Sequence, residues 1–354
     1  MVNRFLALTA VVIAMAIIAV ISIFSGRPSE AIENSKLLGT DQFRQSLASD
    51  LRNAKQSIIV TTYLVEAYPD NIILDELEGA RIRGVEVRLM MDYRDLEEYP
   101  TILQDLQFRN IPFKVISGHA KVAVIDKAIA YVGSSNLNRN GLQDNWELDL
   151  RSVTPSTVDE AYRYLDLLWK NGRKTVIDKD YSPERFVNGD EFYDLMITGL
   201  QKAHDVKMLT YVTSYSYLDQ NATDSKVFNE LKSAHDRGAT LQIMIDDSEY
   251  QMRNSAQNFL LKNNVPHRLD ENGTEAQILH AKAVLFDDKV LFIGSHNMDE
   301  HSLNSAQEVS IMTSDPKVIS AFLEIFDEKW DFGYSPDGIL GNGNSTDTKP
   351  EVSE

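Results

Sequence analysis

Two segments of the chain carry the same set of residue types that can do chemistry, in the same order. Each has a histidine, a lysine two positions later and an aspartate five positions after the lysine. The members are His119, Lys121 and Asp126 in the first segment and His280, Lys282 and Asp287 in the second. Each set is followed by a Gly-Ser-x-Asn turn and then a glutamate, which contribute Ser134, Asn136, Glu147, Ser295, Asn297 and Glu308.

This spacing suits the chemistry of phosphate esters. On a strand, residues two apart point to one face, so each histidine and its lysine project together. Two lysines with serine hydroxyls and asparagine amides would form a pocket for a tetrahedral oxyanion. Two imidazoles on opposite sides of a phosphorus atom allow displacement in two stages, in which one attacks and the other protonates the departing alcohol. The pattern therefore predicts a covalent phosphohistidine.

Other roles compete for some of these residues. Asp126 and Asp287 are also typical of turn residues that close a strand hairpin. Glu147 and Glu308 are either carboxylates that fix a histidine tautomer or solvated strand residues. A metal site is disfavoured because the lysine beside each histidine places a cation where a metal ion would bind. We expect no metal ion and no other cofactor.

An internal repeat defines the architecture. The segments that begin at His119 and His280 match without a gap at an offset of 280 − 119 = 161 residues, as far as Trp169 and Trp330. Upstream, the segments that begin at Leu74 and Phe228 match at an offset of 228 − 74 = 154 residues. The chain is therefore a duplicated domain.

Strands alternate with helices in each copy, which predicts a layered α/β sandwich. Apolar runs predict strands, and the glycines that follow two polar–apolar periodic segments predict helix ends. The predicted strands are 57–64, 85–91, 122–125, 129–132, 206–213, 239–245, 283–286 and 290–293, and the predicted helices are 71–83, 226–237 and those that begin near Pro155 and Pro316 and bury Trp169 and Trp330. We expect domains at 35–177 and 191–335, joined by a linker at 178–190.

Both segments resemble the HKD motif of the phospholipase D superfamily, and the resemblance extends from about Ile59 to Gly333. It implies two pseudo-twofold-related α/β/α sandwich domains that form one active site from both motifs, so that a monomer suffices. It implies that His119 is the nucleophile and His280 the general acid/base.

The resemblance also assigns the neighbouring residues. It places both lysines and both aspartates in the catalytic set, the serines and asparagines at the phosphate, and the glutamates behind the imidazoles. The copies differ in one respect: Glu147 lies in Asn145-Trp146-Glu147, as is frequent in the family, whereas Glu308 lies in Ala306-Gln307-Glu308.

The amino-acid composition excludes several classes of protein function. The chain has 354 residues and no cysteine, which excludes disulfide frameworks, thiol catalysis and iron–sulfur clusters. A formal net charge of -18 argues against a broad grip on duplex DNA, which needs a basic face.

The N-terminus suggests a membrane. Phe5–Phe24 has no charged residue, and at about 1.5 Å per residue it spans the roughly 30 Å of a bilayer core. We expect residues 1–28 to be a retained transmembrane anchor with the catalytic body outside the cytoplasm; a cleaved secretion signal and a buried helix are the alternatives. Residues 336–354 are polar and aperiodic, which predicts a disordered tail.

The hypothesis is therefore a membrane-tethered phosphodiesterase that cleaves or transfers a phosphatidyl group, with phospholipid as its partner. A metal-independent endonuclease is the alternative, disfavoured by the net charge. A non-catalytic phosphate-binding protein is the third, disfavoured because both motifs are complete.

Overall fold

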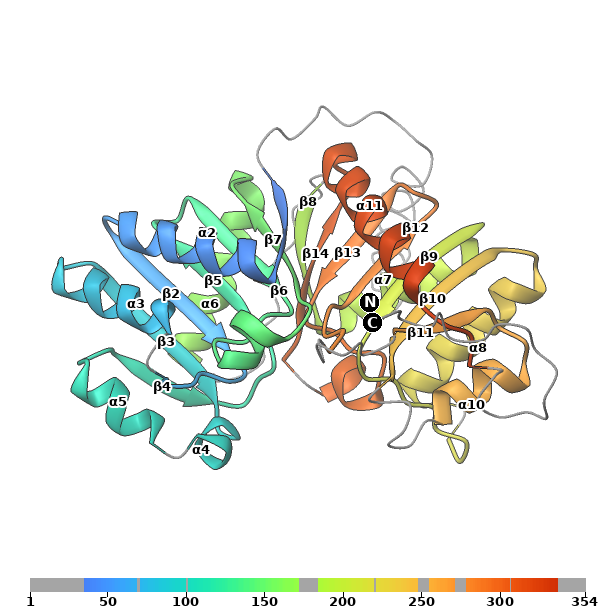
Figure 1. The fold of residues 1–354 in the computed structure, drawn as a ribbon, viewed down its shortest axis with the longest axis horizontal. Coiled ribbons are helices and arrows are strands. Elements are labelled where there is room, and N and C mark those ends of the chain that lie inside the picture. The colour runs from blue at the N-terminus through green and yellow to red at the C-terminus, as the bar shows by residue number, and fades with distance from the viewer. Residues whose placement is uncertain are drawn as a thin grey trace, which may run out of the picture.

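The computed structural model describes residues 35–68, 71–99, 101–171, 184–219, 221–247, 255–270, 278–305 and 307–336. It shows two similar halves side by side, each built on a seven-stranded sheet (Figure 1). The two halves follow the sequence repeat, which confirms the predicted duplication of an α/β domain.

The first sheet is mixed. Its strands are β1 (Lys36–Gly39), β2 (Ser57–Thr62), β3 (Glu86–Asp92), β4 (Phe113–Ile116), β5 (Val122–Ile125), β6 (Ile129–Gly133) and β7 (Leu148–Ser152), in the spatial order β1-β7-β6-β5-β2-β3-β4. Strands β2, β3 and β4 are parallel, whereas β5, β6, β7 and β1 join by antiparallel pairing. Parallel strands of this sheet end at one edge, and the loops that follow them converge there.

The second sheet repeats the first. Its strands are β8 (Glu184–Asn188), β9 (Asp205–Thr210), β10 (Thr240–Asp246), β11 (His267–Asp270), β12 (Ala283–Phe286), β13 (Val290–Gly294) and β14 (Val309–Thr313), in the spatial order β11-β10-β9-β12-β13-β14-β8. Here β9, β10 and β11 are parallel and the remaining strands are antiparallel.

Helices cover the sheets of both halves. They are α2 (Thr40–Asn53), α3 (Ile72–Ile82), α4 (Asp95–Glu98), α5 (Ile102–Phe108), α6 (Pro155–Asn171), α7 (Gly189–Lys202), α8 (Thr223–Asp236), α10 (Ser255–Lys262) and α11 (Pro316–Phe332), with single π-helical turns η1 (Asn140–Asp144) and η2 (His301–Ser305). The Asn71 side chain caps α3 by accepting from the amides of Ile73 and Leu74. The predicted helix ends are confirmed, because Gly84 and Gly238 follow α3 and α8 with φ of 88° and 86°.

One hydrophobic core lies between the two halves, in addition to a core within each half. Buried side chains of both sheets meet in it, among them Val132 and Leu150 from the first half and Ile293 and Ile311 from the second. Helix α6 packs against β2, β5 and β6 and also against β8 of the second sheet, while α11 packs against β10 and β11 and also against β1 of the first. A core that both halves build fixes one half relative to the other, which is what a site between them requires.

Two predicted details need correction. The predicted linker 178–190 contains β8 and the start of α7, so the second half begins earlier than residue 191; strand β8 pairs with β14 and closes the sheet. Trp169 and Trp330 lie against the shared core but are only partly buried.

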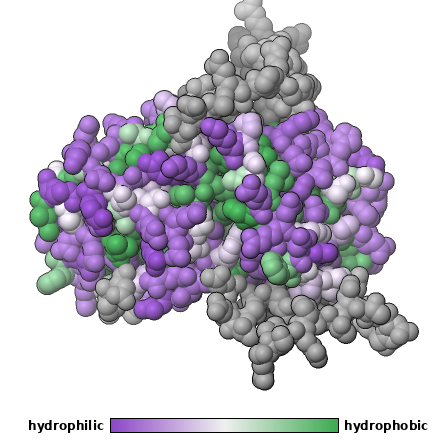
Figure 2. Space-filling view, turned by 45° about the horizontal axis from the view of Figure 1, so that its top comes forward, coloured by the Kyte–Doolittle hydropathy of each residue, from purple (hydrophilic) through white to green (hydrophobic). Residues whose placement is uncertain are grey.

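The membrane prediction falls outside the described part of the chain. No helix among the described residues is long and apolar enough to cross a bilayer, and the predicted span at residues 5–24 is not among them. Nor is the predicted tail, apart from Pro336. On the face shown in Figure 2, hydrophilic residues predominate and hydrophobic ones form smaller groups.

Candidate active site

The two histidines lie at the centre of the sheets, immediately before equivalent strands. His119 precedes β5 and His280 precedes β12, and both strands lie between neighbours in their sheets. The backbone carbonyl of each histidine accepts a hydrogen bond from the lysine two residues later, at 2.6 Å from Lys121 Nζ to the His119 oxygen. Each histidine and its lysine therefore stand together, as the strand spacing predicts.

Each imidazole is held by a carboxylate of the other half. His119 Nδ1 lies 2.8 Å from Glu308 Oε1, and His280 Nδ1 lies 2.8 Å from Glu147 Oε2. Both carboxylates are almost completely buried. The exchange brings the two motifs to one place, and it fixes both imidazoles through Nδ1, which leaves Nε2 of each ring for chemistry.

Backbone hydrogen bonds accompany the exchange. The His119 amide donates to the Gln307 carbonyl at 3.0 Å, and the His280 amide donates to the Trp146 carbonyl at 2.9 Å. The residue before each glutamate is thus bonded to the histidine of the opposite half. Because backbone and side chain both cross between the halves, neither imidazole is positioned by its own half alone.

A second polar group supports each carboxylate, and the two halves use different ones. Asn145 Nδ2 donates to Glu147 Oε1 at 3.1 Å, while Ser302 Oγ donates to Glu308 Oε1 at 2.7 Å. The Ser302 hydroxyl therefore does for Glu308 what the Asn145 amide does for Glu147. This contact accounts for the absence of an Asn-x-Glu sequence in the second copy.

Two tyrosines that sequence reasoning missed cover the histidines. The Tyr63 ring lies 4.5 Å from the His119 ring, and the Tyr211 ring lies 4.9 Å from the His280 ring, measured between ring centroids. The lysine of each motif sits over the same tyrosine, at 5.3 Å for Lys121 and Tyr63. A repeated Thr-Tyr at the ends of β2 and β9 is the sequence signal that marks both residues.

The serines and asparagines of the Gly-Ser-x-Asn turns are buried beside the histidine strands. The hydroxyls of Ser134 and Ser295 accept hydrogen bonds from the amides of β7 and β14 respectively. Oδ1 of Asn136 accepts from the Leu64 amide and Oδ1 of Asn297 from the Val212 amide, both at 3.3 Å. Because these oxygens hold the loops after β2 and β9, the NH₂ groups are what the asparagines offer to an anion.

Asp126 and Asp287 do not belong to this cluster, which corrects their assignment to the catalytic set. They lie in the turns β5–β6 and β12–β13, at the far ends of the strands that the histidines precede, with φ of 52° and 51°. Asp126 accepts from the amides of three consecutive residues, 55–57, and Asp287 accepts from those of His204 and Asp205. Each aspartate fastens a hairpin to the strand beside it, which is the turn role that the sequence left open.

Two further aspartates position the loops that lead to the histidines. Asp92 Oδ2 accepts from the Gly118 amide at 2.7 Å, and Asp246 Oδ2 accepts from the Leu279 amide at 2.7 Å. Both aspartates are the last residues of equivalent strands, β3 and β10. Their identical place in the repeat is a sequence signal for this positioning role.

Burial lowers the pKa of both imidazoles. It brings the pKa of His119 to about 4 against the opposing effect of Glu308, and it lowers the pKa of His280 well below its usual value, helped by the charges of Lys282 and Lys121. Burial also lowers the pKa of Lys121 to about 8 and of Lys282 to about 7, although both lysines face carboxylates. The charges of both lysines lower the pKa of His280, so the two motifs are close enough to interact electrostatically.

The pKa values of the two carboxylates, Glu147 and Glu308, are shifted in opposite directions. Burial raises the pKa of Glu147 to about 7, against the lowering effects of Lys282, Ser134 and Asn145. Burial also raises that of Glu308, but the lowering effects of His119 and Lys121 outweigh it and bring the pKa to about 2. His119 therefore has the more fully ionised carboxylate behind it.

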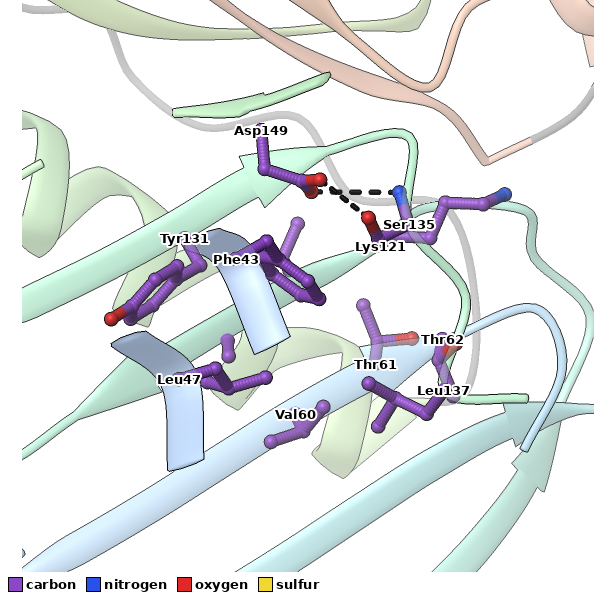
Figure 3. Close-up of a pocket in the computed structure, with 12 residues that line it drawn as sticks. Phe43, Leu47, Val60, Thr61, Thr62, Lys121, Tyr131, Ser135, Leu137 and Asp149 are labelled. Atoms are coloured by element: carbon purple, nitrogen blue, oxygen red, sulfur yellow. Dashed lines mark hydrogen bonds between the residues drawn. The ribbon is translucent and has the colours of Figure 1, made fainter. Parts of the chain in front are cut away.

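A small cavity lies behind Lys121 in the first half, lined mostly by apolar side chains of β2, β5 and α2 (Figure 3). The carboxylate of Asp149 reaches it and accepts from the hydroxyl of Ser135. A Cβ at Gly133 would overlap Asp149, so this position needs glycine. Burial raises the pKa of Asp149 to about 7. The contact between Asp149 and Ser135 supports the turn that carries Ser134.

The cluster can therefore offer two neutral imidazoles, two lysines and several N–H donors to a tetrahedral anion. Among the described residues, no group of three or more His, Asp and Glu side chains is arranged to hold a metal ion.

Comparison with known proteins identifies the family and the fold. The sequence profile described as "Cardiolipin synthase, PLD-like domain" matches residues 47–169 and 196–330. Phospholipase D Z of Dictyostelium discoideum is 23% identical over 74% of this chain and 76% of its own length, and cardiolipin synthase 2 of Staphylococcus epidermidis is 23% identical over 83% and 67%. The crystal structure of phosphatidylserine synthase from Haemophilus influenzae has a TM-score of 0.67 at 14% identity and covers 88% of this chain and 90% of its own.

Proposed function

The chain belongs to the cardiolipin synthase, PLD-like domain family, and on that premise we propose that it cleaves or transfers a phosphatidyl group through a phosphohistidine intermediate. Membership makes it a phospholipase D-like phosphodiesterase or phosphatidyltransferase. The observation that carries the proposal is the exchange of carboxylates between the halves, which presents two imidazoles, each oriented through Nδ1, to one site.

His119 attacks the phosphorus through Nε2, a P–N bond forms, and the P–O bond to the departing alcohol breaks. His280 acts from its protonated form, which its lowered pKa makes scarce but strongly acidic, and gives its Nε2 proton to the alcohol oxygen as that bond breaks. His280 then takes a proton from water or from an acceptor alcohol, whose oxygen attacks phosphorus and releases His119. Water as acceptor gives hydrolysis and an alcohol gives transfer. Lys121 and Lys282 stabilise the charge on the phosphoryl oxygens in both steps.

The electrostatic difference between the glutamates supports this order of roles. A nucleophilic imidazole becomes positive as it attacks, and a fully ionised carboxylate at Nδ1 stabilises that charge. The pKa of Glu308 is lowered whereas that of Glu147 is raised, so Glu308 meets this need for His119 better than Glu147 does for His280. The more exposed side chain also belongs to His119, at 20% against 10% for His280, which favours its approach to a substrate.

The asparagine amides and the Gly-Ser turns complete the proposed phosphate pocket. Since one chain supplies both motifs, the active unit is a monomer. The proposed domains are residues 35–171 and 184–335, and the uncharged segment 5–24 anchors them to a membrane on its outer side, close to lipid substrate.

The test uses the full chain in mixed detergent–phospholipid micelles with chelator and an added alcohol. We expect a phosphatidyl alcohol and free headgroup alcohol among the products, and single-stranded DNA that stays intact. Cleavage of the DNA with unchanged lipid would show an endonuclease instead. Turnover of neither would refute both activities.

Histidine variants test the intermediate. His119→Ala and His280→Ala should each lose essentially all turnover, and an acid-labile, base-stable phosphoryl label should appear on the wild-type chain. His204→Ala is the matched control, because its side chain is exposed and lies outside the cluster. Full activity of either active-site variant contradicts the mechanism.

A further inference from the structure

The two halves of the site differ in charge at equivalent loops. Tyr93 and Arg94 follow β3, and the positions 154 residues later, after β10, are Asp247 and Ser248. Arg139 precedes η1, and the position 161 residues later, before η2, is Glu300. The first half thus carries the cations Arg94 and Arg139 where the second carries the neutral Ser248 and the anion Glu300, and the second half has a further anion, Asp247, where the first has Tyr93. In a pseudo-symmetric site, such a difference decides which way round a charged substrate binds.

Arg94 is the cation that lies beside the reacting groups. Its Nη1 donates to the Tyr63 hydroxyl at 3.4 Å and its Nε donates to the Tyr93 hydroxyl at 3.3 Å. Tyr63 is the ring that covers His119 and Lys121. Arg94 is exposed, and among the described side chains its N–H groups donate to the neutral phenols of Tyr63 and Tyr93.

No described carboxylate forms an ion pair with Arg94. Seven of the thirteen described arginines form ion pairs with described carboxylates, and Arg94 is one of the six that do not; the seven are Arg44, Arg52, Arg88, Arg109, Arg151, Arg163 and Arg185. Arginine is a bidentate ligand for phosphate, and an unneutralised one retains its full charge for an incoming anion.

We propose that Arg94 forms an anion subsite beside His119 that binds a second phosphate of an anionic phospholipid. The subsite selects lipids whose reacting phosphodiester is accompanied by another phosphate, and it orients them with that phosphate toward the first half. This proposal deepens the proposed function and rests on it. A nucleic acid fits less well, because its strand carries phosphates on both sides of the reacting one and would meet Asp247 and Glu300 in the second half.

The acidic residues of the second half are engaged in ways that keep their charge near the site. Glu300 accepts from the hydroxyl of Thr223 and from the Asn304 amide, and Asp247 accepts from the Tyr334 hydroxyl. The Thr223 hydroxyl and the Asn304 amide are uncharged, so Glu300 keeps its negative charge and repels a second anion on its side.

The test compares kcat/KM for cardiolipin, which carries two phosphates, with kcat/KM for phosphatidylcholine, which carries one, in matched micelles. Arg94→Gln should lower the ratio of the two values at least about tenfold, which corresponds to about 1.4 kcal/mol, mainly through KM for cardiolipin. Arg94→Lys should retain most of the ratio, since it keeps the charge. Arg163→Gln is the matched control, an exposed arginine on α6 paired with Asp159, and should leave the ratio unchanged.

Equal losses on both lipids would show that Arg94 acts structurally, and an unchanged ratio would overturn the subsite. A selective loss on oligothymidylate, with the lipid ratio unchanged, would assign the subsite to nucleic acid and overturn the lipid proposal. Calorimetry with inorganic pyrophosphate and phosphate separates this inference from the proposed function. The wild type should bind pyrophosphate more tightly than phosphate, and Arg94→Gln should lose that preference, even if neither lipid is turned over. An equal preference for pyrophosphate in both proteins would count against the subsite.

Discussion

Replacing Glu308 with glutamine tests the exchange of carboxylates most directly. The amide keeps the shape and one oxygen acceptor for His119 Nδ1, which lies 2.8 Å from Oε1, but removes the negative charge. Two bounds give the expected cost. A charge-assisted hydrogen bond exceeds a neutral one by about 1.5 kcal/mol, and two unit charges about 4 Å apart at an effective dielectric constant of about 20 attract by about 4 kcal/mol. The first chemical step should therefore slow about 10- to 1000-fold.

The assay separates the two imidazoles through the leaving group. Bis(p-nitrophenyl) phosphate releases an alcohol that needs little protonation, whereas a phospholipid headgroup needs a general acid. Glu308→Gln weakens the nucleophile and should slow both substrates to a similar extent. Glu147→Gln weakens the acid His280 and should slow the lipid at least about tenfold more than the p-nitrophenyl ester.

Two outcomes would refute this reasoning. The reverse pattern, with Glu147→Gln slowing both substrates, would show that His280 is the nucleophile. Wild-type rates in both variants, with thermal midpoints unchanged, would show that the carboxylates do not act on the imidazoles at all.

Three further predictions concern pH and stability. Lys282 has a pKa of about 7 in the free protein, so it loses its positive charge as the pH rises and kcat/KM should fall above about pH 7. A kcat/KM that is constant from pH 6 to 9 would contradict the role of the Lys282 charge in stabilising the phosphoryl oxygens. Gly133→Ala should lower the free energy of unfolding by about 1–3 kcal/mol, because the added Cβ overlaps Asp149. Gly79→Ala, in the helix α3, should raise it by about 0.4–1 kcal/mol. Denaturant unfolding of both variants measures this contrast, and equal midpoints would show that the overlap at Gly133 relaxes without cost. Asp126→Asn keeps a residue that tolerates positive φ, and it should cost about 1 kcal/mol of stability while most of the turnover remains. Loss of turnover in a folded variant would return Asp126 to the catalytic set.

The proposed role of Arg94 would also make a duplicated domain directional. The repeat supplies two equivalent histidine–lysine pairs, and symmetry alone would leave a substrate two equal orientations. Substitutions at the loop positions add to the differences at the motifs, where Asn145 supports Glu147 and Ser302 supports Glu308. The variants of Arg94 proposed above test this at the level of substrate choice.

The sequence by itself determined the duplication, eight of the fourteen strands and four of the nine α-helices that the structure describes, and the paired histidines and lysines of the site. These features are encoded locally: a strand or a helix shows in the period of its own apolar residues, and a repeat shows in direct comparison of two segments. The helix ends at Gly84 and Gly238 were predictable because positive φ at such a position demands glycine. Strand β8 was missed because residues 184–188 have no strong alternation and acquire their structure by pairing with β14.

Only the tertiary structure decided which partner each group has. Glu308 lies 189 residues from His119 along the chain, and nothing in the local sequence distinguishes this pairing from one within the second half. Likewise, the pattern that contains Asp126 fits a catalytic acid and a turn residue equally well, and the amides that its carboxylate binds come from a strand about 70 residues away. Tyr63 and Arg94 meet because β2 and β3 are parallel neighbours and end at the same edge of the sheet. Contacts between distant segments depend on how the sheets and the shared core bring the chain together, and that information is spread over the whole fold.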